Sequence, residues 1–114
     1  PIYIHKTMKI KINNKECELK YSYRALMLFE DKTGKSLANA NDSLGTLLQL
    51  LYCFVQVKSD VTEEEFYDWI DEDPKNLPNL SVWLGKEMNK WSAAVNKSPL
   101  LKKANEVKED SKNA

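Results

Sequence analysis

The sequence has very little of the residue types on which most catalytic and metal sites depend. Of its 114 residues, one is histidine, two are cysteine and three are glycine. The histidine, His5, lies close to the N-terminus, which excludes most histidine-dependent nucleophilic sites and most zinc sites. The glycines stand apart from one another, so there is no phosphate-binding loop and no dinucleotide fingerprint. We therefore expect no catalytic residues, no cofactor and no metal ion, and we expect that the protein is not an enzyme.

Arginine is almost absent as well. Arg24 is the only arginine among 17 basic residues, and 17 acidic residues balance them. A neutral chain has no long-range attraction to nucleic acid or to anionic membranes, and bidentate recognition of phosphate favours arginine. No apolar run is long enough to span a bilayer, and the N-terminus lacks a signal-peptide pattern. With only Cys17 and Cys53, no disulfide framework is expected. The sequence predicts a cytoplasmic protein that binds neither nucleic acid nor membrane.

An alternating pattern near the N-terminus predicts a β-hairpin. Apolar residues alternate with lysines over residues 8–12 and with charged residues over residues 16–21, and the Asn-Asn-Lys segment between them tolerates positive φ. Ser22 then fits the N-cap of a helix over residues 23–33, and Gly34 fits its C-cap. Because this helix is apolar on nearly every side, we expect it to be central, between the hairpin and other helices.

Three further helices are predicted after this segment. The first begins at Asp42 or Ser43 and reaches about Val57. The second begins with the capping box of residues 62–65 and ends at residues 73–74. The third runs from about residue 78 to 96 and contains Gly85, which suggests either the close approach of another backbone or a bend. The residues expected to be fully buried are Leu26, Phe29, Leu48 and Leu51.

These elements predict an α+β fold, mainly helical, in which an N-terminal antiparallel β-hairpin packs on a bundle of four to five helices. Residues 8–96 form the single globular domain. Residues 1–7, which precede Met8, are expected to be an N-terminal extension or residues added before the native start. Residues 97–114 are expected to be a charged, partly frayed C-terminal tail.

Eight acidic residues and no basic residue fall between positions 60 and 73. Glu65, Asp68 and Glu72 would share one helix face, and carboxylates arranged in this way can bind a divalent cation. A metal-dependent enzyme that uses the acidic helix 63–73 is therefore an alternative from another class. Acidic residues also suit a helix N-terminus and a solvated helix face, and we favour this interpretation.

Large aromatic residues predict a surface that binds another protein. Trp83 and Trp91 are eight positions apart, so they lie close to one face of the last predicted helix, and tryptophan is enriched where proteins bind one another. The same spacing is also typical of core tryptophans. An excess of basic residues in 1–59 and of acidic residues in 60–114 would favour either internal packing or a homo-oligomer. The predicted partner-binding residues are Tyr52, Trp69, Trp83, Leu84, Met88 and Trp91.

Three segments carry a family resemblance: ECELKYSYRALMLFEDKTGKSL, LLQLLYCFVQ and TEEEFYDWIDEDP. Together they resemble the tail assembly chaperones of long-tailed bacteriophages and prophages, over roughly residues 8–85. Those proteins often begin with a hairpin of the type I-x-I-N-N-K-x-Y-x-L-K and enter a helix that ends in T-G-K. Cys17 stands here where an aromatic residue is commoner.

The resemblance implies a non-catalytic protein that binds the helical tape-measure protein during tail assembly in the host bacterial cytoplasm. A small adaptor or regulatory domain, which would bind some other protein, is the alternative within the same class. Both interpretations fit a chain without catalytic machinery. They differ only in the partner.

Overall fold

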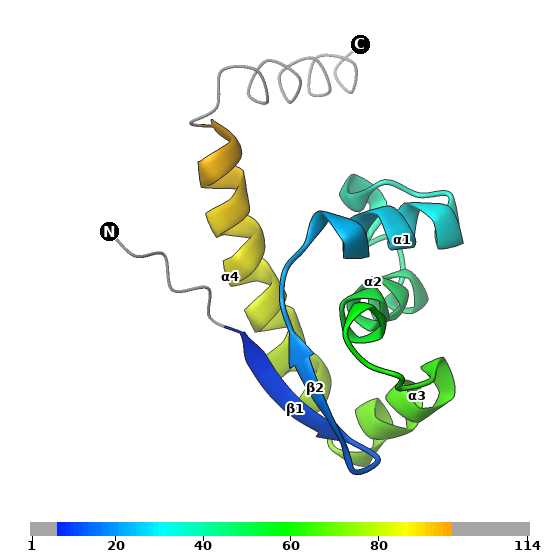
Figure 1. Ribbon diagram of the computed structural model, residues 1–114. Coiled ribbons are helices and arrows are strands. Elements are labelled where there is room, and N and C mark those ends of the chain that lie inside the picture. The colour runs from blue at the N-terminus through cyan, green and yellow to red at the C-terminus, as the bar shows by residue number, and fades with distance from the viewer. Residues whose placement is uncertain (1–6, 97–114) are drawn as a thin grey trace. The chain divides into compact units, whose positions relative to one another are not determined.

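A computed structural model of the chain describes residues 7–96 (Figure 1). Its elements follow in the order β1 (Met8–Ile12), β2 (Lys15–Leu19), α1 (Tyr23–Thr33), the short 3-10 helix η1 (Leu37–Asn39), α2 (Leu44–Val57), α3 (Glu63–Glu72) and α4 (Asn76–Asn96). The predicted α+β fold, mainly helical with an N-terminal antiparallel hairpin, is confirmed. The expectations for a fifth helix, for most of the N-terminal extension and for the C-terminal tail lie outside the described residues.

The chain divides into two compact units, residues 1–84 and residues 85–114, and α4 crosses the boundary between them. The first unit contains the hairpin, α1 to α3 and the beginning of α4. The described part of the second unit is the rest of α4. Within it, Lys90 Nζ donates a hydrogen bond to Glu87 Oε1 at 3.3 Å, one turn apart on the helix.

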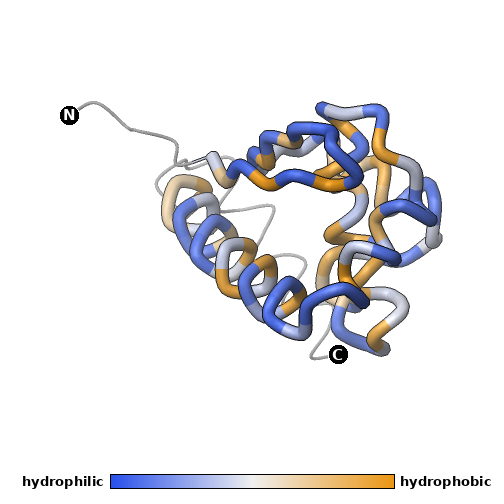
Figure 2. Tube along the Cα trace, turned by 90° about the horizontal axis from the view of Figure 1, so that it is seen from below, coloured by the Kyte–Doolittle hydropathy of each residue, from blue (hydrophilic) through white to orange (hydrophobic). Residues whose placement is uncertain are grey.

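The hairpin has the two-residue turn that the asparagines permit. Asn13 and Asn14 have φ angles of 50° and 63°, as a type I′ turn requires. Lys15 already belongs to β2, opposite Ile12, so the turn is one residue shorter than the Asn-Asn-Lys segment. Figure 2 shows the alternation of apolar and polar residues along the two strands. Opposite charges face each other across the strands in the pairs Lys9–Glu18 and Lys11–Glu16.

Helix α1 has the predicted boundaries. Ser22 Oγ accepts a hydrogen bond from the Ala25 N–H at 3.2 Å, and Gly34, at a φ of 69°, donates its N–H to the Glu30 carbonyl. The expectation that α1 is buried on nearly every side is wrong. Only Ala25 and Phe29 are buried in this helix. It packs on α2 with one face, beside η1, and its other face lies at the surface of the first unit (Figure 1).

The central helix is α2. It contacts both α1 and β2, and the six consecutive residues from Leu50 to Val55 are all buried. Phe29 and Leu51 are buried as expected, at 0% and 2% exposure. Leu26 and Leu48 are only partly buried, so the prediction for these two residues is wrong. Leu26 lies on a helix covered on one face, and Leu48 precedes the part of α2 that is enclosed on all sides.

Helix α4 begins two residues earlier than expected. The Asn76 N–H donates to the Asp73 carbonyl at 3.0 Å, and Pro78 occupies the first turn, where a missing N–H is tolerated. A side chain at Gly85 would meet no atom of the described residues within 4 Å. The close approach of another backbone, one of the two explanations considered for this glycine, is therefore not found.

Candidate functional site

The N-terminus of α3 is tied to the hairpin through one carboxylate. Thr62 Oγ1 accepts the Glu65 N–H at 3.1 Å, and Glu65 Oε1 accepts the Thr62 N–H at 2.9 Å, which confirms the predicted capping box. The same carboxylate accepts hydrogen bonds from Asn13 Nδ2 and from Lys15 Nζ, the latter at 3.0 Å. The Thr62 backbone bond, followed by those from Asn13 and Lys15, lowers the pKa of Glu65 to about 2. Glu65 is thus held as a carboxylate that joins α3 to the turn between β1 and β2.

A second carboxylate in the same turn of α3 joins this helix to α1. Glu63 accepts hydrogen bonds from the Tyr67 hydroxyl at 2.7 Å and from Lys32 Nζ at 2.9 Å, and both bonds lower its pKa. Burial and the bond to Glu63 raise the pKa of Tyr67 to about 12. Lys32 also lies 4.8 Å from the centre of the Tyr52 ring, a cation–π distance. These contacts connect α1, α2 and α3.

The acidic residues of this segment therefore fall into two groups. Glu63 and Glu65 hold neighbouring elements together, whereas Asp68, Asp71 and Glu72 are exposed. Within residues 7–96 no group of three or more histidine, cysteine or carboxylate side chains could hold a metal ion. The alternative of a metal-dependent enzyme on the acidic helix has no candidate metal site in that range.

Three of the six predicted contact residues are buried: Tyr52, Trp83 and Leu84. The Tyr52 hydroxyl donates to the Val61 carbonyl at 2.7 Å, and its ring lies 5.6 Å from that of Phe66. The Trp83 ring meets Phe54 edge to face at 5.7 Å. Its indole N–H has no acceptor among the described residues. These side chains belong to the core of the structure and are not available at its surface.

The other three predicted contact residues are partly buried. Trp69 stacks on Phe66 at 6.2 Å, and its carbonyl accepts a hydrogen bond from Asn76 Nδ2 at 2.7 Å, which links α3 to the start of α4. Met88 and Trp91 belong to the second unit. The six residues are thus divided between the two units.

The exposed apolar residues are different ones, which sequence reasoning missed. On α1, Tyr23 and Met27 are 52% and 60% exposed, and they are one helical turn apart. Leu44, in the first turn of α2, is 61% exposed, and Val82 on α4 is 57% exposed. The sequence contained a signal for this exposure. A helix that is apolar on nearly every side is fully buried only if other elements cover all of its faces, and a small domain has few such elements.

No helix within residues 7–96 is long and apolar enough to cross a bilayer. Comparisons with models of known protein families, with curated proteins and with solved structures return no match. The exposed surface of the chain and the resemblance of residues 8–85 are therefore the features that bear on its function.

Proposed function

We propose that this protein is a non-catalytic tail assembly chaperone, which binds a helical tape-measure protein through the exposed apolar face of α1. One observation carries the proposal. Met27 and Tyr23 lie one turn apart on a helix with well-formed caps at both ends, and more than half of each side chain is exposed. The resemblance of residues 8–85 to tail assembly chaperones supports the identity of the partner.

The chemistry of this face suits another helix as its partner. A stripe of apolar residues at a spacing of three and four positions can pack against the stripe of a second amphipathic helix, and α1 continues the stripe with the partly buried Leu26. Methionine is flexible and polarizable, so it adapts to different partner side chains. A tape-measure protein offers a long series of such stripes, and many weakly bound copies would cover it reversibly.

The proposed setting is the host bacterial cytoplasm, where the tail is assembled. The zero net charge gives the chain no general attraction to nucleic acid. An adaptor or regulatory domain would use the same α1 face on a different protein, so the identity of the partner separates the two functions.

Co-expression tests the proposal. The chain is produced together with the long helical protein encoded beside it, and the soluble fraction of that protein is measured. We expect the wild-type chain to raise this fraction. Met27→Lys places a charge on the α1 face and should abolish the effect, whereas Val82→Lys makes the same kind of change at an exposed apolar position on α4 and should preserve it.

Circular dichroism shows whether both variants retain their helices. If the partner is no more soluble with the wild-type chain than without it, the chaperone function is wrong. If the wild-type chain raises the soluble fraction of the partner and the Met27→Lys variant raises it equally, the chaperone function is retained but the contact surface is not the α1 face.

A further inference from the structure

The hairpin has two outer edges, and the register shows which backbone groups point toward them. In a hairpin with a two-residue turn, the residues that flank the turn exchange hydrogen bonds, and so does every second pair beyond them. Here these pairs are Ile12–Lys15, Ile10–Cys17 and Met8–Leu19. The N–H and C=O groups of the residues in between point outward: Lys9 and Lys11 on β1, and Glu16 and Glu18 on β2.

Both edges are open in the part of the chain that the structure describes. The sheet there has two strands, and no backbone hydrogen bond outside the hairpin involves the four outward-pointing residues. Their side chains are all exposed. An open strand edge is a template for the addition of another strand, and a sheet of only two strands is stabilised when a third is added.

We propose that β1 of one copy of this chain pairs with β2 of a second copy along these open edges. The two strands run antiparallel, in the register that they already have inside the hairpin. Lys9 then lies opposite Glu18 of the second copy, and Lys11 lies opposite Glu16 of the second copy. Each lysine has a glutamate on either side, one from its own hairpin and one from the neighbouring copy.

The charges select this pairing over its alternatives. Two β1 strands would place lysine against lysine, and two β2 strands would place glutamate against glutamate. Like charges directly opposite each other destabilise a sheet, whereas opposite charges stabilise it. Lysines on an edge strand usually prevent indiscriminate pairing, so on β1 they restrict the added strand to one that carries acidic residues at alternate positions, as β2 does.

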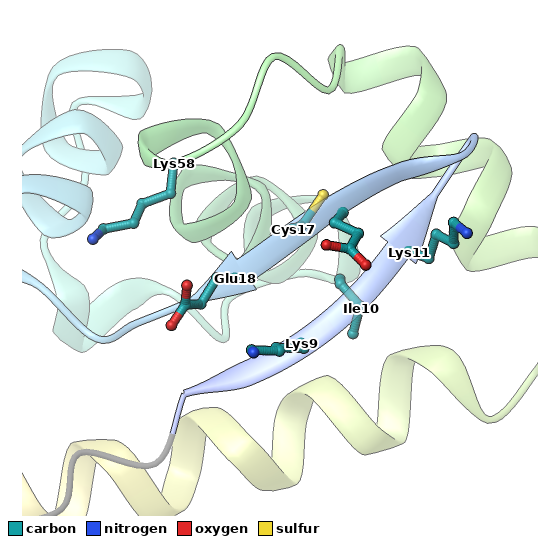
Figure 3. Close-up of a pocket in the computed structure, with 7 residues that line it drawn as sticks. Lys9, Ile10, Lys11, Cys17, Glu18 and Lys58 are labelled. Atoms are coloured by element: carbon teal, nitrogen blue, oxygen red, sulfur yellow. The ribbon is translucent and has the colours of Figure 1, made fainter.

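A depression lies over the hairpin and involves both strands. It has a volume of about 440 Å³ and is lined by three residues of each strand and by Lys58, which follows the last residue of α2 (Figure 3). Three lysines and two glutamates line it. Because both strands line it, the depression is separate from the edges at which the two copies pair.

The pairing joins two different surfaces of the same chain, so every added copy leaves one β1 edge and one β2 edge open. Such contacts produce open chains of copies, or rings where the rotation closes. The inference goes beyond the proposed function, because the hairpin edges do not include the α1 face. The pairing of copies and the proposed function can therefore each be wrong without affecting the other.

A charge-exchange variant tests the pairing. It carries Lys9→Glu, Lys11→Glu, Glu16→Lys and Glu18→Lys, which preserve opposite charges both inside the hairpin and between identical copies. In sedimentation experiments we expect the wild-type chain and the exchange variant each to self-associate as concentration rises. In a mixture of the two, each carrying a different fluorescent label, we expect no energy transfer between the labels, because lysine would meet lysine and glutamate would meet glutamate.

The mixture also distinguishes the alternatives. Pairing of β1 with β1 would make wild type and exchange variant prefer each other, so strong energy transfer in the mixture would overturn the proposal. A wild-type chain that stays monomeric from micromolar to millimolar concentration would overturn it as well.

A backbone variant gives an independent measurement. Lys11→Pro removes an N–H that points outward and that the hairpin does not use, so self-association should weaken by about tenfold or more. Lys11→Gln also removes the charge but retains the N–H, so it should associate more tightly than Lys11→Pro does. Unchanged association of a folded Lys11→Pro chain would contradict the proposal, and if that variant does not fold, the mixture decides.

Discussion

The same substitution at two neighbouring positions of α2 should have very different effects on stability. Leu51 is 2% exposed and lies within the enclosed run from Leu50 to Val55, whereas Leu48 is only partly buried. Both residues are leucines inside one helix, so the difference in helix propensity on mutation to alanine is the same at both sites. Burial is therefore the main variable.

The magnitudes follow from that burial. Leu51→Ala removes a buried side chain and leaves a cavity, which costs about 2–5 kcal/mol. At Leu48 part of the side chain already contacts solvent, and water can fill the space that alanine leaves. Leu48→Ala then loses only part of the transfer free energy of a leucine side chain, and the expected loss of stability is about 1 kcal/mol. For a domain of this size each kcal/mol lowers the melting temperature by about 4–8 °C.

Urea titrations followed by tryptophan fluorescence measure both variants against the wild type, and the three tryptophans supply the signal. The slope m should be unchanged, so that a shift in midpoint reports a change in the free energy of unfolding. Equal losses at the two positions, or a larger loss for Leu48→Ala, would refute the packing described for α2.

Two further predictions concern glycine positions and pH. Gly34 has a φ of 69°, so Gly34→Ala should destabilise the protein by about 1–2 kcal/mol. Gly85 has an open position within α4, so Gly85→Ala should stabilise the protein by about 1 kcal/mol. Melting temperatures that shift in the same direction for both variants would contradict this prediction. The pKa of Glu65 is about 2 in the folded chain, below its usual 4.5. Its stabilisation is therefore complete above the unfolded pKa and is lost as the pH falls from about 5 to about 2. In urea titrations across this range, Glu65→Gln should lose less stability than the wild type, and equal losses would count against the role of this carboxylate.

Most element boundaries were predictable because they depend on contacts between residues close in the chain. Ser22 bonds the N–H three positions later, Gly34 bonds a carbonyl four positions earlier, and Thr62 and Glu65 cap each other. Such interactions need no knowledge of the rest of the fold. The two-asparagine turn is of the same kind, since positive φ is a local preference of those residues.

The candidate surface was predicted less well. Tyr52, Trp83 and Leu84 were expected at a contact face and are buried, while Tyr23 and Met27 are exposed although their helix was expected to be central. An apolar side chain on a helix has the same local pattern in both situations. Its burial depends on which other element lies against it.

The sequence by itself determined the hairpin, its turn and the helix caps, because each of these depends on residue type and on neighbours within a few positions. Only the tertiary structure decided that α2 is the enclosed helix and α1 a surface helix, and that Glu65 bonds Lys15, 50 positions away. Contacts over such separations form only when the whole chain packs. The same local pattern permits several ways of covering an apolar face, so the local pattern does not determine which one the chain adopts.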